Sequence, residues 1–168
     1  MKRVQGSKGL PLIECINPKI KKYRIRYDIR PYINEEGEEQ GVTFLESEIL
    51  HKPYINEVKE IVLSGYNQAI DEKILSGFTW NDMPVWLSSE NQFNYKAAYD
   101  LAVMSEGKTL PVTFKFGTTE NPVYHTFENL DELTDFYLRA MDYISKTLEE
   151  GWKLKDSIDW GEYEILLK

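Results

Sequence analysis

Hydrophobic and charged residues alternate over the segment KYRIRYDIRPYI, residues 22–33. The apolar positions are Tyr23, Ile25, Tyr27 and Ile29, and the polar positions among and after them include Arg24, Arg26, Asp28 and Arg30. A period of two is typical of a half-buried strand, so this segment predicts a strand with one wet, basic face. Pro31 predicts the end of the strand or an edge position, because proline has no N–H to donate to a neighbouring strand.

The segment VTFLESEIL, residues 42–50, predicts an antiparallel return strand after the charged loop NEEGEEQG. On this strand Glu46 and Glu48 can face Arg24 or Arg26. Such cross-strand ion pairs contribute roughly a few tenths of a kcal/mol at a wet surface.

Helical spacing replaces this alternation between residues 55 and 75. The apolar residues of this stretch are Ile55, Val58, Val62, Ala69 and Ile70. Their spacing predicts an amphipathic helix over residues 56–75. Pro53 fits the first turn, where a missing N–H costs nothing, and Gly77 predicts the end of the helix.

The segment FTWNDMPVWL, residues 78–87, predicts a two-residue hairpin around Asn81 and Asp82. Such a turn needs positive φ at both central positions, which Asn and Asp tolerate better than most residues. The paired residues would be Phe78 with Val85 and Trp80 with Met83, all on one apolar face. Trp86 then lies on the opposite face.

A second helix is predicted from Ser88 or Ser89, with Ser89 and Gln92 at the spacing of a capping box. Its apolar stripe consists of Phe93, Ala97, Leu101 and Met104. We expect this stripe to face the core, as helical periodicity usually indicates.

The layout then repeats: LPVTFKFG and VYHTF predict a further hairpin, and Asn129 with Glu132 predicts the cap of a long helix. The inward stripe of this helix would be Leu130, Leu133, Tyr137, Ala140, Ile144 and Leu148, with the helix ending near Gly151. The tail, which contains Trp152, Trp160 and Tyr163, is expected to fold back, with a short helical turn after Ser157.

These elements predict an α+β fold in which antiparallel hairpins alternate with helices, as a repeated ββα unit with the helices packed on one face of the sheet. The predicted organisation is a basic amino-terminal arm or edge segment over 1–21, a hairpin and helix over 22–75, and a ββα-ββα domain over 76–168. The alternative to this division is that the hairpin and helix of 22–75 form one compact unit with residues 76–168. The pattern does not fit a doubly wound parallel fold, because such a fold needs single strands between its helices.

Charge is distributed unevenly along the chain, whose net charge is −8. Nine basic and two acidic residues give the first 31 positions a net charge of +7, so the remainder carries −15. The basic segment is either balanced by its own domain or docks on an acidic neighbouring subunit. An acidic chain argues against nucleic acid as a partner, and no apolar run is long enough to suggest a membrane.

Candidate catalytic residues are few. Cys15 has no local signature of a nucleophile, and the two histidines, His51 and His125, lack carboxylates at metal-ligand spacing. Acidic pairs such as Asp131-Glu132 are explained by the positive end of a helix. No phosphate-binding, dinucleotide-binding or hydrolase motif occurs in the sequence. We therefore expect no catalytic residue, metal or cofactor.

Exposed aromatic residues are the better candidates for a binding site, because Tyr and Trp are favoured at surfaces that are both apolar and wet. The strand registers place Trp86 and Tyr124 off the buried faces. The basic strand adds Arg24, Arg26 and Arg30 as candidate binding residues.

The runs IDEKILSGFTWNDMPVWLSSENQFNYKAAYDLA, LPVTFKFG, PVYHTFENLDELTDFYLRAMDYI and DSIDW resemble the family of domain of unknown function 4376, over about residues 70–160. That family recurs in proteins of tailed phages and prophages, often near tail-fibre genes. The upstream segment YRIRYDIRPY to KPYINEVKEIV looks like the region that precedes the domain in gut Bacteroides versions. Asp82 departs mildly from the Asn-Gly usual in the family's turn.

The resemblance implies a non-catalytic structural or assembly protein of a phage or prophage tail, whose partners are other tail proteins or further copies of itself. Its expected location is the cytoplasm of the bacterial host during assembly, or the virion. A receptor- or glycan-binding module that uses exposed aromatics is the alternative, and a small hydrolase is the third hypothesis.

Overall fold

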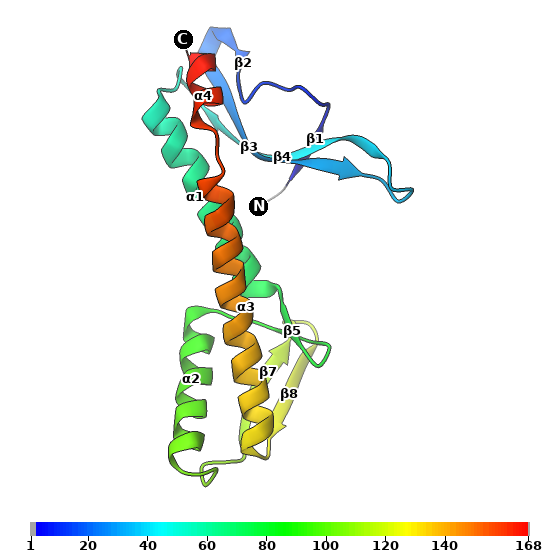
Figure 1. Cartoon of the computed structure of the whole chain (residues 1–168), viewed down its shortest axis with the longest axis vertical. Helices are drawn as coiled ribbons and strands as arrows, with labels where there is room; N and C mark the ends of the chain where they lie inside the picture. The colour runs from blue at the N-terminus through cyan, green and yellow to red at the C-terminus, as the bar shows by residue number, and fades with distance from the viewer. Residues whose placement is uncertain (1–2, 168) are drawn as a thin grey trace. The chain divides into compact units, whose positions relative to one another are not determined.

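The computed structural model describes residues 3–167, which form two compact units. The first unit contains the residues up to Ala69 together with those from Lys153 on, and the second is Ile70–Trp152. Helices α1 (Ile55–Ser76) and α3 (Leu130–Asp156) each contribute residues to both units (Figure 1). The fold is α+β with antiparallel strand pairs throughout the described residues, as the sequence predicted.

The first unit contains a four-stranded sheet in the order β1-β4-β3-β2. Its strands are β1 (Val4–Gly6), β2 (Ile13–Asn17), β3 (Lys22–Ile33) and β4 (Glu39–Ile49), and the short 3-10 helix η1 (Pro18–Ile20) joins β2 to β3. Residues 4–17 thus supply both edge strands. The amino-terminal segment, predicted to be a basic arm or an edge segment, therefore forms edge strands of the sheet within residues 4–17. Four strands, not a single hairpin, therefore precede α1.

Strands β3 and β4 form the predicted antiparallel pair, with Arg24 opposite Glu48 and Arg26 opposite Glu46. A bulge after Tyr27 interrupts the alternation, and Asp28 has a positive φ of 51°. The side chain of Ile29, predicted to point inward, is consequently 41% exposed. Strand β3 continues through Pro31, which lies beyond the stretch paired with β2 and so occupies an edge position.

The core of the first unit forms where α1 and the carboxy-terminal helix α4 (Trp160–Leu167) cover the sheet. Its buried residues include Ile25, Tyr27, Leu45, Val58, Val62 and Tyr163. The phenol of Tyr163 donates a hydrogen bond of 2.9 Å to the carbonyl oxygen of Arg26, so the tail does fold back as expected. Helix α1 begins two residues after Pro53, which precedes its first turn and does not lie within it.

The second unit begins with the hairpin of β5 (Phe78–Trp80) and β6 (Met83–Val85). Its register is the predicted one, and Asn81 and Asp82 have φ values of 47° and 60°. Helix α2 (Ser89–Met104) follows, and the Ser88 hydroxyl accepts the N–H of Asn91 at 3.2 Å. Ser88 is therefore the N-cap, and the predicted Ser89–Gln92 box is wrong.

The buried face of α2 differs from the predicted one. Tyr95 and Ala102 are buried, whereas Phe93, Leu101 and Met104 are exposed. Tyr95 packs edge-on against Phe114, with ring centroids 4.8 Å apart. The predicted stripe thus points away from the core because an aromatic stripe on the other side of the helix packs inward instead.

A second hairpin, β7 (Val112–Gly117) with β8 (Pro122–Phe127), packs with α3 around an aromatic core. The largest fully buried members of this core are Trp80, Phe127 and Phe136. The Asn129 side chain accepts the N–H of Glu132 at 2.9 Å, so the predicted cap of α3 is confirmed. Helix α3 is longer than predicted, and it passes Gly151 and ends at Asp156.

Candidate binding surface around Trp86

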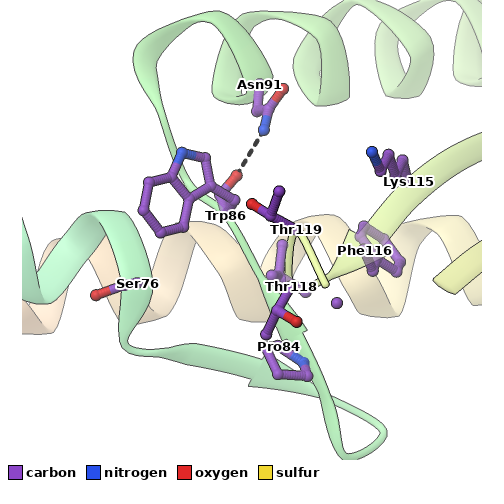
Figure 2. Close-up of a pocket in the computed structure, with 10 residues that line it drawn as sticks. Ser76, Pro84, Trp86, Asn91, Lys115, Phe116, Thr118 and Thr119 are labelled. Carbon is purple, nitrogen blue, oxygen red and sulfur yellow. Dashed lines mark hydrogen bonds between the residues drawn. The ribbon is translucent and has the colours of Figure 1, made fainter. Parts of the chain in front are cut away.

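Trp86 is the first residue after β6 and is 51% exposed. Its neighbour Val85 points into the core, and the alternation of a strand therefore turns the indole outward. The side-chain amide of Asn91 donates a hydrogen bond of 2.8 Å to the carbonyl oxygen of Trp86 (Figure 2). This bond fixes the backbone of Trp86 to the first turn of α2.

The indole borders a hollow of about 310 Å³ in the second unit. The hollow is lined by Ser76, Pro84, Val85, Trp86, Asn91, Lys115, Phe116, Gly117, Thr118 and Thr119. Phe116 and Val85 are buried and supply apolar lining, whereas the hydroxyls, the amide and the Lys115 ammonium supply hydrogen-bonding groups (Figure 2). An aromatic ring beside a few polar groups suits a polar side chain or a sugar as ligand.

The turn between β7 and β8 holds the threonine side of the hollow in place. Gly117 has a φ of 80°, and a Cβ there would lie 2.3 Å from the carbonyl oxygen of Asn121, so only glycine fits. The hydroxyl of Thr118 accepts the N–H of Asn121 at 3.1 Å. The turn is thus ordered by its own hydrogen bonds.

Tyr124, the second predicted aromatic, is 68% exposed on β8. It lies directly opposite Lys115 of β7. Directly opposed residues of an antiparallel pair share a face, and Lys115 also lines the hollow beside Trp86. Lys115, which the sequence did not single out, therefore lies opposite Tyr124 and lines the same hollow as Trp86.

The three candidate arginines belong to the first unit, and most of their charge is engaged within the sheet. Arg26 is 3% exposed, which corrects its predicted place on a wet face. Its guanidinium donates to the carbonyl oxygen of Pro11 at 2.7 Å and to Glu14 at 2.6 Å, and it lies over the ring of Phe44. The segment from Pro11 to β2 covers this arginine.

Arg24 lies between Glu46 and Glu48, with nitrogen–oxygen distances of 3.3 and 2.8 Å. The hydrogen bond that Arg24 donates to Glu48 raises the pKa of Arg24. The hydrogen bonds from Lys22 and then Arg24 lower the pKa of Glu48. These charges compensate one another at the surface of the sheet.

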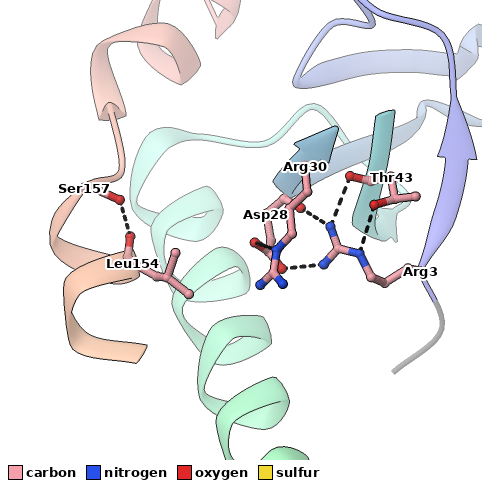
Figure 3. Close-up of polar contacts among 6 residues, drawn as sticks. All are labelled: Arg3, Asp28, Arg30, Thr43, Leu154 and Ser157. Atoms are coloured by element: carbon pink, nitrogen blue, oxygen red, sulfur yellow. Dashed lines mark hydrogen bonds and ion pairs between the residues drawn. The ribbon is translucent and has the colours of Figure 1, made fainter. Parts of the chain in front are cut away.

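Arg30 donates to Asp28 at 2.9 Å, and the same carboxylate also binds Arg3 (Figure 3). Arg3 further donates to the hydroxyl and the carbonyl oxygen of Thr43, at 3.2 and 3.1 Å. Arg3 therefore ties the amino-terminal edge to the bulge at Asp28. Of the three candidate arginines, Arg30 keeps the most exposed side chain.

Both histidines are held by carboxylates. His125 lies 2.9 Å from Glu132 and packs edge-on against Trp80, and His51 contacts Glu57. Within residues 3–167, no group of three His, Cys, Asp or Glu side chains could hold a metal ion. No helix of the described part of the chain is long and apolar enough to cross a membrane.

The structure defines an α+β protein of two units, and its second unit presents the exposed Trp86 beside a hollow. The family model of the domain of unknown function DUF4376 matches residues 57–166, and the chain belongs to that family. The match begins within α1 and ends within α4, so the four-stranded sheet lies upstream of it. Searches of curated proteins and of solved structures found no match.

Proposed function

We propose that the chain is a non-catalytic structural or assembly protein of a tailed phage or prophage, associated with the tail or tail fibre. It acts through contacts with other tail proteins or with further copies of itself, in the host cytoplasm during assembly or in the virion. The phage assignment comes from the family resemblance. The contact function is supported by the large apolar side chains that lie outside both cores.

Those side chains include Trp86, Phe93, Met104 and Tyr124, each more than half exposed. Such exposed apolar surface is typical of interaction sites. Trp and Tyr are also the residues that most often dominate binding energy, since they bury much area while keeping a polar group available. The polar groups around Trp86 would form the rim of such a contact.

Deletion of the gene from a lysogen, followed by prophage induction, tests this function. Electron microscopy of the particles and an immunoblot of purified virions and assembly intermediates give the readout. We expect defective tails or fewer complete particles, restored by the wild-type gene and restored poorly by a Trp86→Ala, Tyr124→Ala double variant. Leu50→Ala, which removes an exposed apolar side chain from the first unit, is the control and should restore assembly. Normal particles from the deletion strain, with the protein absent from particles and intermediates, would refute the proposal.

Glycan binding is the second candidate, and the hollow beside Trp86 favours it. An indole face with threonine hydroxyls, an amide and an ammonium nearby can stack on a sugar and bond its hydroxyls. A glycan array with the full chain would show selective binding that Trp86→Ala abolishes. An array without selective binding would remove this candidate and leave the assembly function untouched.

A further inference from the structure

The outward face of α2 carries a continuous apolar stripe. Phe93, Ala97, Leu101 and Met104 follow one another at intervals of four, four and three residues, so they span roughly 80° of the helix at 3.6 residues per turn. Phe93 is 71%, Leu101 53% and Met104 74% exposed. A narrow stripe at this spacing is typical of the contact line between two packed helices.

We propose that this stripe is a homodimer interface, in which α2 packs antiparallel against α2 of a second copy about a two-fold axis. The inference deepens the proposed assembly function by naming one surface and its partner. In this arrangement Phe93 faces Met104 of the second copy, and Ala97 faces Leu101 of the second copy. The Phe93 ring then packs against the flexible Met104 side chain, and Leu101 packs against the small Ala97, so the two helices can approach closely.

Charge complementarity on one flank supports a second copy as the occupant. Lys96 and Asp100 lie on the same side of the stripe and pair with each other at 2.6 Å. A two-fold axis of this kind brings the same flank of both helices together. At the register set by the stripe, Lys96 lies opposite Asp100 of the second copy, and Asp100 opposite its Lys96. The dimer thus forms two further ion pairs from existing charges.

At this register Glu90, in the first turn of α2, lies at the opposite end of the interface from Glu90 of the second copy. The other flank has the uncharged residues Asn94, Ala98 and Ser105, so no like charges meet there. A parallel pair would instead bring Glu90 against Glu90 and leave Lys96 without an acidic neighbour across the interface. Antiparallel helix dipoles add to this preference.

The size of the surface predicts a dimer that dissociates on dilution. The interface centres on one helix of 16 residues, which buries less than the roughly 1,200 Å² of a standard interface. A membrane is a poorer occupant for the stripe, because a membrane-surface helix needs a basic polar face and Glu90 and Asp100 border this one. Sedimentation with and without anionic vesicles distinguishes the two occupants.

Analytical ultracentrifugation of the full chain, from low to high micromolar concentration, tests the interface. We expect the mass to rise from the 19.7 kDa monomer towards twice that value. Phe93→Ser and Met104→Ser should each raise the dissociation constant about tenfold or more, which corresponds to about 1.4 kcal/mol. Leu50→Ser, an equally exposed apolar position in the first unit, is the control and should dimerise as the wild type does. Circular dichroism checks that each variant is folded.

A charge-swap pair tests the antiparallel arrangement. Asp100→Lys makes the flank wholly basic and Lys96→Glu makes it wholly acidic, so each variant alone should dimerise less than the wild type. An equimolar mixture of the two should form heterodimers at least as well as the wild type forms homodimers. A monomeric mass at every concentration, unchanged dimerisation of the stripe variants, or no gain on mixing would overturn the proposal. These outcomes concern the purified chain, whereas the particle experiment tests the assembly function independently.

Discussion

The indole N–H of Trp80 donates a hydrogen bond of 3.0 Å to the carboxylate of Asp135, which joins the β5/β6 hairpin to α3. Trp80 is almost fully buried among aromatic rings, and a buried indole N–H needs a partner. The other oxygen of Asp135 accepts from Arg139 at 2.8 Å. The bond from Trp80, followed by that from Arg139, lowers the pKa of Asp135 below 3.8.

Replacement of Asp135 by Asn should make the stability of the chain less dependent on acid pH. The folded-state pKa of Asp135 lies below its unfolded value of 3.8, so the carboxylate stabilises fully above that value. This stabilisation is lost as the pH falls through the folded-state pKa. Asp135→Asn keeps an acceptor for Trp80 and removes the titration, so its unfolding free energy should approach that of the wild type in acid.

Urea unfolding at neutral pH and at several acid pH values measures this convergence. Asp142→Asn is the control, because Asp142 lies seven residues after Asp135 on α3 and pairs with Lys146, not with Trp80, among the contacts described. A stability difference between wild type and Asp135→Asn that stays constant across the acid range would contradict the role of this carboxylate.

Local features were predictable from the sequence where the signal depends on adjacent residues. The hairpin at Asn81 and Asp82 is such a case, because positive φ at two successive positions restricts the choice of residue. The cap at Asn129 is another. The exposure of Trp86 and Tyr124 also followed from strand alternation, which needs no knowledge of distant elements.

The buried face of α2 was not predictable, because two stripes compete on one helix. Helical spacing alone permits either the stripe of Phe93 and Leu101 or that of Tyr95 and Tyr99 to face inward. The choice depends on partners from other elements: Tyr95 meets Phe136 and Tyr99 stacks on Tyr137, with centroids 5.0 and 4.4 Å apart. Tertiary packing therefore decides what periodicity leaves open.

Long-range partners also explain the error at Arg26. Alternation places this residue on the polar face of β3, but the segment around Pro11 returns over that face and accepts its hydrogen bonds. The hollow beside Trp86 also depends on segments that are distant in sequence, because its lining combines the turn after β7 with the first turn of α2. The pairing of segments far apart in sequence is not encoded in the period of either one.

Gly65→Ala should destabilise the chain by about 1–3 kcal/mol, as overpacking of a core does. A Cβ at residue 65 would lie 2.3–2.5 Å from three atoms of the Tyr27 side chain, which is buried and cannot move freely. On an exposed helix surface the same change would stabilise the protein by about 1 kcal/mol. The sign of the change in unfolding free energy therefore tests whether Tyr27 packs against Gly65. Urea unfolding monitored by circular dichroism measures it.

Ser64→Ala is the matched control for Gly65→Ala. Its site is the preceding residue of α1 and is exposed, so alanine there gains helix propensity without meeting Tyr27. We expect a neutral or slightly stabilising effect. Equal stabilities for the two variants would contradict the contact between Gly65 and Tyr27.

Arg26→Ala should cost about 2–3 kcal/mol of unfolding free energy, because it removes a buried cation that satisfies other polar groups. The carbonyl of Pro11 and the carboxylate of Glu14 both lose a donor. Arg30→Ala removes the same charge from an exposed site beside Asp28 and should cost well under 1 kcal/mol. Chemical unfolding of both variants gives the comparison, and similar losses would show that net charge, not burial, is responsible.

Tyr95→Phe should make the chain more resistant to alkaline unfolding. Burial raises the pKa of Tyr95 from 10.0 to about 12, so the fold favours the neutral phenol. The stabilisation associated with this group is therefore complete below pH 10.0 and is lost as the pH rises towards 12.

Phenylalanine cannot ionise and still packs against Phe114 and Phe136. At neutral pH the variant should differ from the wild type by about 1 kcal/mol or less, and above pH 10.0 it should become the more stable of the two. Urea unfolding across this pH range measures where the unfolding free energies of the two proteins become equal. Tyr124→Phe, at an exposed site, is the control for a lost hydroxyl. A difference between wild type and Tyr95→Phe that stays constant at all pH values would show that ionisation of the Tyr95 phenol does not destabilise the fold.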